Sequence, residues 1–269
     1  MSKTIVLIGC GHLGAAMLQG WLSNSGPGYQ FFAIDPKADA LSRQFSGVRF
    51  GADSSILPQA VDAIVIALKP AKFKEILPLY KNYIGAGTLV ISVAAGMTIG
   101  KIQEFLSAPN AAVVRAMPNL PSQIGQGVAG ALANVHVTPV QKQLAQSVLS
   151  SLGSVIWVDD EKYMDAVTAT SGSGPAYVFR LCEVMAEAGV KSGLPRDVAM
   201  TLARQTVIGS ALYMQQSDKS VADLRSSIAT PGGTTEAALN VLNQNNALQD
   251  LFDLAIAAAT ARGKILSGS

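Results

Sequence analysis

Two glycine-rich turns contain the residue types best suited to bind an anionic ligand. The first follows a largely apolar run at residues 4–8 and precedes apolar residues at helical spacing. It fits the pattern G-x-G-x-x-G with Gly9, Cys10, Gly11, His12, Leu13 and Gly14. A second apolar run, at residues 31–34, ends at Asp35. Glycines in this order let backbone N–H groups approach a pyrophosphate, and the acid accepts hydrogen bonds from a ribose, so we expect a dinucleotide site.

The second glycine-rich turn lies near the other end of the chain, between helix-like segments. Pro231 fixes the backbone and Gly232 and Gly233 free it, so this stretch is a turn. Thr234 or Thr235 then begins the next helix. From residue chemistry alone, this turn is either a plain helix start or a site for an anion.

Three further loops follow expected strands at residues 63–68, 88–92 and 112–115, with helices near 72–80 and 98–106 between them. Loops at the carboxyl ends of parallel strands meet at one edge of a sheet, where ligands of such folds bind. Lys69 either contacts a ligand there or is only solvated, and Asn119 offers both a donor and an acceptor. We expect cofactor contacts from Ala67, Leu68, Lys69, Pro70, Ala94, Ala95, Gly96, Met117, Pro118 and Asn119.

The alternation of strands and helices predicts an α/β fold for residues 1–160, a Rossmann-type doubly wound parallel sheet. Two more strands, at 127–133 and 154–158 around a helix at 139–152, are expected to extend the edge of the sheet. Strand patterns then stop, so residues 161–269 are expected to form an all-α substrate and dimerisation domain. Its helices are expected near 163–171, 175–191, 195–214, 221–228, 235–242 and 247–266.

Composition excludes several classes of function. Hydrophobic residues make up 49% of the 269, which is ample for a core. Lysine and arginine (20) nearly balance aspartate and glutamate (18) without a basic block, so we expect no nucleic-acid partner. Apolar stretches are of strand length and no signal peptide is recognised, so we expect no membrane partner and a cytoplasmic location.

The cysteine and histidine inventory argues against metal and histidine chemistry. Cys10 and Cys182 are far apart and lack metal-type spacing, and we expect no disulfide between them. His12 and His136 are the only histidines, too few for a histidine-based metal cage. We therefore expect no metal site.

The motifs GCGHLG, ALKP, SVAAG, VRAMPNLP, SGSGPAYVF and TPGGTTEAAL occur in this order along nearly the whole chain. With them the sequence resembles the pyrroline-5-carboxylate reductases. The resemblance implies hydride transfer from NADPH or NADH to the C=N carbon of 1-pyrroline-5-carboxylate, giving L-proline in the last step of its biosynthesis. It also implies a homodimer or a higher homo-oligomer formed through the helical domain.

The resemblance assigns the second turn to the substrate. Thr230, Gly232, Gly233, Thr234 and Thr235 then bind the substrate carboxylate, through backbone N–H groups and hydroxyls. Thr235 occupies the catalytic position, where a threonine hydrogen-bonds the ring nitrogen, as a proton donor or only as a positioning group. No strong acid is needed, because a protonated imine is already electrophilic.

Some residues depart from the family pattern. His12 replaces an asparagine, glutamine or similar residue, and Thr230 replaces a serine. Glu236 follows the paired threonines where an apolar residue is typical; it would repel a substrate carboxylate, so we expect it to point away. Asp35 favours NADH by repelling a 2′-phosphate, although family members use NADPH and Lys37 offers partial compensation.

Two other functions compete with this hypothesis. A β-hydroxyacid dehydrogenase needs a general base, a lysine on an early helix of its second domain, but no lysine lies between Lys162 and Lys191. A nucleotide-sensing regulator needs the glycine turn but has no use for a carboxylate turn among helices. In the stretch at 169–179, Gly172, Ser173, Gly174 and Pro175 are expected to bend a long helix or to let another backbone pass close to it. Ser173 and Tyr177 are either structural or reach a site.

Overall fold

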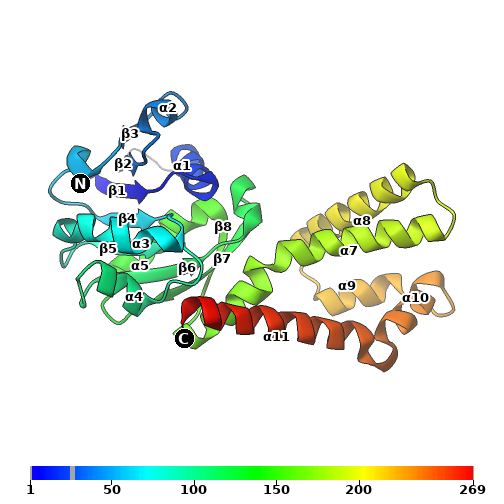
Figure 1. Cartoon of the computed structure of the whole chain (residues 1–269). Helices are drawn as coiled ribbons and strands as arrows, with labels where there is room; N and C mark the ends of the chain where they lie inside the picture. The colour runs from blue at the N-terminus through cyan, green and yellow to red at the C-terminus, as the bar shows by residue number, and fades with distance from the viewer. Residues whose placement is uncertain (1, 25–27, 269) are drawn as a thin grey trace. The chain divides into compact units, whose positions relative to one another are not determined.

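The computed structural model describes residues 2–24 and 28–268, which form two compact units (Figure 1). The first unit comprises Met1–Ser173 with Ala259–Ser269, and the second comprises Gly174–Ala258. The contacts divide the chain later than the boundary expected after residue 160. The reason is that Met164 is fully buried in the core beside the sheet and Val167 packs against Gly130 of a strand.

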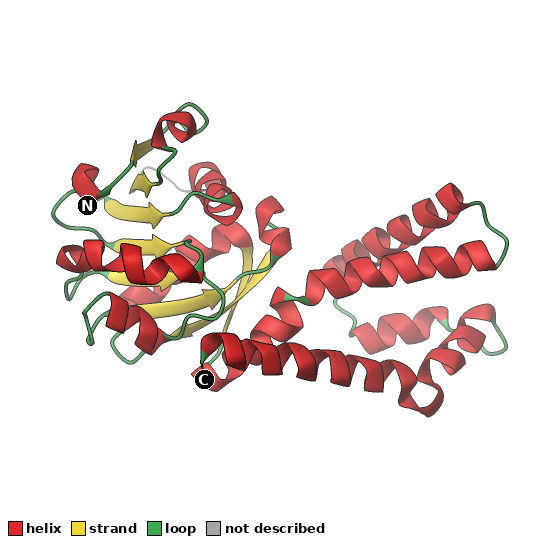
Figure 2. Cartoon of the chain, in the orientation of Figure 1, coloured by secondary structure: helices red, strands yellow, loops and turns green. Residues whose placement is uncertain are grey.

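The first unit contains an eight-stranded sheet between helices, shown in yellow and red in Figure 2. Its spatial order is β3-β2-β1-β4-β5-β6-β7-β8. Strands β1 to β6 run parallel, as predicted, although β3 was not among the expected strands. Strand β7 is antiparallel to β6, and β8 is parallel to β7. The strands are β1 (Lys3–Ile8), β2 (Tyr29–Ile34), β3 (Val48–Gly51), β4 (Ala63–Ile66), β5 (Leu89–Ser92), β6 (Ala112–Met117), β7 (Gly127–Ala133) and β8 (Gly153–Trp157).

The inner strands are continuously apolar because helices cover both faces of the sheet. In β1, Ile5 and Leu7 point into one core layer, and Val6 and Ile8 point into the other. The helices that complete these layers are α1 (His12–Asn24), α3 (Phe73–Ile76), α4 (Ile99–Phe105) and α5 (Pro139–Leu149). The short α2 (Ala38–Ser42) follows β2.

Two segments of the first unit differ in detail from the expected helices. The helix expected at 72–80 is divided into the 3-10 turns η2 (Pro70–Lys72) and η3 (Leu77–Tyr83) around α3. A proline stands in the first turn of each 3-10 segment, where its missing N–H is tolerated. The helix expected at 163–171 consists of α6 (Met164–Val167) and a π-helical turn, η7 (Thr168–Gly172).

The second unit is helical, as predicted. It contains α7 (Gly174–Lys191), α8 (Arg196–Gln216), α9 (Val221–Ile228), α10 (Thr234–Asn243) and the first half of α11 (Ala247–Ser267). Helices α7 and α8 pack against each other through small side chains, with Ala186, Ala199 and Ala203 buried between them (Figure 1). No helix within the described ranges is long and apolar enough to cross a membrane.

The topology of the sheet changes direction between β1 and β4. The chain winds from β1 toward β3 on one side, and from β4 toward β6 on the other. Ile8 and Ile66, the last residues of β1 and β4, lie side by side in register. Ser92 of β5 is next to Ile66, and Arg115 of β6 is next to Ser92. A crevice outside such a switch point is where ligands bind in open α/β sheets.

Candidate functional site

The three glycines of the first turn differ in what an added side chain would meet. Gly9 has a φ of +90°, and a Cβ there would lie 2.9 Å from the carbonyl oxygen of Ala67. A Cβ on Gly14 would overlap the carbonyl oxygen of Gly9, so Gly14 lets α1 pack against the turn. Gly11 is different, since a Cβ there meets nothing within 4 Å. The fold itself therefore does not need a glycine at residue 11.

The start of α1 supplies the N–H groups of this turn. Ala15 N donates to Gly11 O at 2.8 Å, which is the first hydrogen bond of the helix. The N–H groups of His12, Leu13 and Gly14 precede that bond and have no intrahelical partner. Aligned N–H groups at a helix N-terminus attract a phosphate.

Asp35 is tied to this turn by its carboxylate. Oδ2 accepts a hydrogen bond from Cys10 N at 2.9 Å, and Oδ1 accepts one from Lys37 N at 2.9 Å. The N–H of Cys10 is thus engaged and does not add to the free N–H groups of the turn. Burial of the Cys10 side chain, and then the nearby Asp35 charge, raise the pKa of its thiol to about 11.

The loops after β4, β5 and β6 lie at the same edge of the sheet as the glycine turn, as predicted. Lys69 is exposed between Leu68, whose side chain approaches Gly9, and Pro70. In the loop after β5, Ala94 is buried, Ala95 is exposed, and Gly96 has a φ of +70°. The loops after four adjacent strands therefore bring small or polar residues to one edge of the sheet.

Asn119 links the loop after β6 to the next strand. Its side-chain Oδ1 accepts a hydrogen bond from Val128 N of β7 at 3.0 Å. Met117 and Pro118 precede it, half-buried and buried respectively. The acceptor of the Asn119 amide is engaged in holding the loop, so its Nδ2 group is the part left to donate to a ligand.

Residues 161–173 also contact the loops of this edge, which the sequence did not indicate. Glu161 Oε1 accepts hydrogen bonds from Arg115 Nη1 and from Ile99 N, both at 2.9 Å. A Cβ on Gly172 would lie 2.8 Å from the Met117 methyl carbon. The acids around residue 160 signalled only a helix cap, and Asp160 does accept from Lys162 N at 2.9 Å. Glu161 directly follows these acids, and nothing local in the sequence indicates that its partner is on β6.

The second glycine-rich turn lies in the second unit, and it forms as predicted. Gly233 N donates to Thr230 O at 2.9 Å to close the turn, and Gly232 has a φ of +73°. Helix α10 begins at Thr234, with Gly233 as its N-cap. The N–H groups of Thr234 and Thr235 are in the first turn of α10 and have no partner within the helix.

The expectation that Glu236 points away from this turn is wrong. Its Oε2 accepts a hydrogen bond from Gly232 N at 2.8 Å, so the carboxylate folds back over the turn. The third residue of a helix commonly reaches back to an N–H before the helix, and here the bond is a variant of that motif. A carboxylate of the chain therefore already occupies one donor of the turn.

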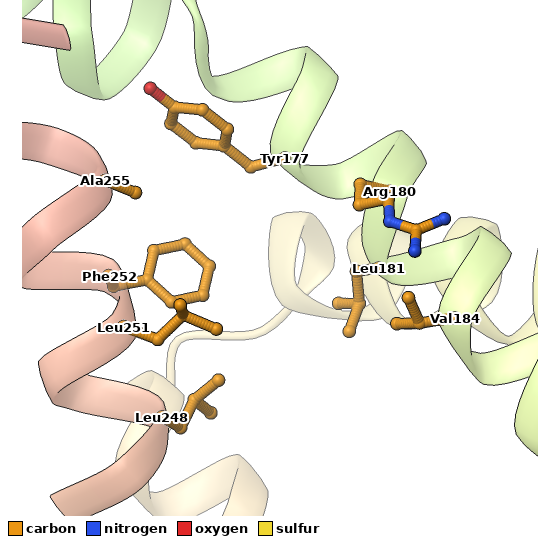
Figure 3. A pocket seen from close by; sticks show the side chains of 8 residues that line it. All are labelled: Tyr177, Arg180, Leu181, Val184, Leu248, Leu251, Phe252 and Ala255. Atoms are coloured by element: carbon orange, nitrogen blue, oxygen red, sulfur yellow. The ribbon is translucent and has the colours of Figure 1, made fainter. Parts of the chain in front are cut away.

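Tyr177 belongs to an apolar pocket of the second unit, shown in Figure 3. Its ring meets the Phe252 ring edge-on at 6.3 Å between centroids. Arg180 stands at the rim and pairs with Glu183 at 2.9 Å. The remaining lining comes from α7 and α11 and is aliphatic: Leu181, Val184, Leu248, Leu251 and Ala255.

The cysteines and histidines are dispersed. Cys10, in the turn after β1, and Cys182, in α7, are both free thiols. His12 is exposed at the start of α1. Within residues 2–24 and 28–268, no group of three or more histidine, cysteine, aspartate or glutamate side chains could hold a metal ion.

Comparison with known proteins matches both parts of the chain. Residues 161–266 match the family model described as pyrroline-5-carboxylate reductase dimerisation. Residues 4–96 match the model described as NADP oxidoreductase coenzyme F420-dependent. The boundary at residue 161 in the first of these models coincides with the end of the sheet rather than with the contact boundary after Ser173.

Full-length relatives agree with the two models. A pyrroline-5-carboxylate reductase of Pseudomonas aeruginosa is 36% identical over 98% of this chain and 96% of its own length. The pyrroline-5-carboxylate reductase of Glycine max is 32% identical over 99% of this chain and 97% of its own length.

Solved structures agree as well. A pyrroline-5-carboxylate reductase of Coxiella burnetii superposes with a TM-score of 0.92 at 35% identity, over 99% of both chains. A pyrroline carboxylate reductase of Plasmodium falciparum with NADP bound superposes with a TM-score of 0.78 at 30% identity, over 98% of both chains. The chain belongs to the pyrroline-5-carboxylate reductase family.

Proposed function

We propose that this chain is an NAD(P)H-dependent oxidoreductase that reduces the C=N bond of 1-pyrroline-5-carboxylate to L-proline, the last step of proline biosynthesis. The observation that carries the proposal is the full-length similarity to reductases of that name. The glycine turn at the switch point of the sheet supports a nicotinamide cofactor independently.

In this reaction a hydride moves from the nicotinamide to the imine carbon, and the electron pair of the C=N bond goes to nitrogen. When the imine nitrogen is protonated beforehand, the product is a neutral secondary amine, and no strong acid is required. The protein then acts mainly by aligning the two reactants and excluding water. We propose that Thr235 hydrogen-bonds the ring nitrogen, as a donor or as a positioning group.

The cofactor is proposed to bind along the carboxyl edge of the sheet. Its pyrophosphate would lie on the N–H groups at the start of α1, with Gly11 allowing the approach. Its ribose would contact Asp35, and its nicotinamide end would lie against residues 94–96 and 117–119. The side-chain amide of Asn119 is the free donor there.

We further propose that NADH is preferred over NADPH. Both oxygens of Asp35 accept backbone N–H groups, which holds the carboxylate in place at the end of β2. A fixed negative charge at this place disfavours a 2′-phosphate. The Plasmodium falciparum relative was solved with NADP bound, so the proposed preference rests on Asp35 of this chain alone.

The substrate carboxylate is proposed to bind at the turn formed by Thr230, Gly232, Gly233, Thr234 and Thr235. The N–H groups of Thr234 and Thr235 and the threonine hydroxyls are the donors available there. The N–H of Gly232 is engaged by Glu236, which reduces the donors by one.

The second unit supports a homodimer or a higher homo-oligomer. Large apolar side chains are exposed on every one of its helices, among them Phe179, Leu212, Ile228, Leu242 and Leu251. The pocket in Figure 3 is lined by such residues. Large exposed apolar surfaces mark interaction sites, and a partner's helices would cover these side chains.

Two organisational features complete the proposal. As functional parts, residues 1–160 would bind the cofactor and residues 161–269 would provide the substrate turn and the subunit interface, a division that the dimerisation model's start at residue 161 supports. The chain is proposed to work in the cytoplasm, without nucleic-acid or membrane partners. Cell fractionation with an antibody against the chain would test the location.

The experiment that tests the reaction compares threonine variants. We expect Thr235→Ala to lower kcat/KM for 1-pyrroline-5-carboxylate by about tenfold to a hundredfold, the loss of a hydrogen bond to a charged group. Thr235→Ser should retain most activity. Thr201→Ala, which removes a hydroxyl that donates to Asp197 O on α8, is the matched control. Equal rates for all three variants would refute the role of Thr235.

The same assay separates the alternatives. Oxidation of a β-hydroxy acid with NAD⁺, without turnover of the imine, would favour the dehydrogenase. Cofactor binding without turnover of any imine would favour the regulator.

A further inference from the structure

Arg115 carries a guanidinium into the interior of the first unit. It lies at the carboxyl end of β6, next to Ser92 of β5, and its side chain is only 4% exposed. Its Nη1 atom lies 2.9 Å from Glu161 Oε1. A charge removed from water needs such a partner, because an unpaired buried charge is strongly unfavourable.

The same carboxylate oxygen has a second partner on another loop. Glu161 Oε1 accepts the N–H of Ile99 at 2.9 Å. Ile99 is the first residue of α4, directly after the loop from β5 that contains Ala94, Ala95 and Gly96. One oxygen atom therefore joins the end of β6 to the end of the β5 loop.

Both connected segments lead into residues that we assigned to the nicotinamide end of the cofactor. Arg115 is two residues before Met117 on β6, and Ile99 is three residues after Gly96. Since each hydrogen bond fixes one of the loops against the same atom, Glu161 sets the distance between them.

We propose that Glu161 is a positioning residue for the nicotinamide end of the cofactor. It acts through Arg115 and Ile99 and does not itself touch the reacting atoms. The inference rests on the proposed cofactor site. It predicts that removal of the carboxylate loosens both loops and weakens the cofactor's alignment in folded protein.

The test measures the KM for NADH, the KM for the imine, kcat and the thermal midpoint in a set of variants. We expect Glu161→Ala to raise the KM for NADH on the order of tenfold, with a lower kcat, as expected for a small misplacement of a reactant. Glu161→Gln keeps an acceptor for both N–H donors, so its KM for NADH should stay within about twofold of the wild type. Its thermal midpoint should nevertheless fall, because the buried Arg115 loses its charged partner. Lys162→Ala is the matched control, because it removes an exposed ion pair with Asp160 next to the site.

If Glu161 only stabilises the fold and does not position the cofactor, the result is different. Glu161→Ala would then lower the thermal midpoint and the yield, while the remaining folded enzyme keeps the KM of the wild type for NADH. That outcome would overturn the proposal. A rise in the KM for NADH that is as large in Glu161→Gln and Lys162→Ala as in Glu161→Ala would overturn it as well.

A second pair of variants keeps the test valid if Glu161→Ala does not fold. Arg115→Met removes the buried charge, and the double variant Arg115→Met/Glu161→Ala then removes only the bond to Ile99. We expect the double variant to have a higher KM for NADH than Arg115→Met alone. Equal values would overturn the proposal.

Gly11→Ala, measured in parallel, separates this proposal from the proposed function. Weak NADH binding in Gly11→Ala, together with an unchanged KM in Glu161→Ala, would overturn the positioning role and leave the cofactor site intact. Unchanged binding in Gly11→Ala would overturn the cofactor site and the positioning role together.

Discussion

Substitution of alanine for Gly11 and for Gly14 should produce opposite effects on binding and on stability. A Cβ on Gly11 meets no atom within 4 Å, and its φ is not in the left-handed region. Alanine restricts the unfolded chain, which stabilises by about 0.4–1 kcal/mol, but it is a poorer N-cap than glycine. These effects offset each other, so the free energy of unfolding should change by less than about 1 kcal/mol.

Cofactor binding should nevertheless fall in Gly11→Ala. The new methyl group would occupy the space through which the pyrophosphate reaches the N–H groups of α1. Loss of one charge-assisted hydrogen bond costs about 1.5–3 kcal/mol. This corresponds to an increase of about 10- to 150-fold in the Kd for NADH.

Gly14→Ala should behave in the reverse way. Its Cβ would overlap the carbonyl oxygen of Gly9, a backbone atom that cannot rotate away. Overpacking of this kind typically costs about 1–3 kcal/mol of unfolding free energy. Urea denaturation and NADH fluorescence titration of both variants measure the two effects. Normal NADH affinity in Gly11→Ala, or normal stability in Gly14→Ala, would refute the roles given to these glycines.

Three further predictions concern single side chains near the two turns. Asp35→Asn keeps an acceptor for Cys10 N but removes the negative charge. The ratio of kcat/KM for NADPH to kcat/KM for NADH should therefore rise about fivefold, equivalent to ~1 kcal/mol of repulsion. An unchanged ratio, measured from initial rates, would contradict this. Glu236→Gln removes a negative charge from the substrate turn, so the KM for the imine should fall severalfold while the KM for NADH stays constant, and a higher KM for the imine would contradict this. Because burial and Asp35 raise the pKa of the Cys10 thiol to about 11, iodoacetamide at neutral pH should label Cys10 far more slowly in native than in unfolded protein, by mass spectrometry. Equal rates would show that the thiol is accessible or ionised.

The elements that the sequence predicted well are those with a local signal. Ile5 to Ile8 form an unbroken apolar run, which a central strand covered on both faces requires. The glycines of the first turn have fixed positions because the strand, the turn and the helix follow one another directly. By contrast, β3 is only four residues long, and its exposed Arg49 interrupts the apolar pattern, so it gave no usable signal.

The features that were missed depend on pairing between distant residues. The reversal of β7 is set by its pairing with β6, and no residue type in either strand encodes direction. Glu161 and Arg115 meet across 46 residues of sequence. The direction of Glu236 is the exception, because it follows from a local hydrogen bond that its side chain accepts from Gly232 N, and the expectation considered only charge repulsion.

The central claim is tested most directly by the initial rate of NADH and NADPH oxidation with 1-pyrroline-5-carboxylate, with proline identified as the product. We predict rapid turnover by the wild type, faster with NADH, and a large loss in Thr235→Ala. If both cofactors bind but neither is oxidised in the presence of the imine, the proposed reaction is wrong even though the nucleotide site is real.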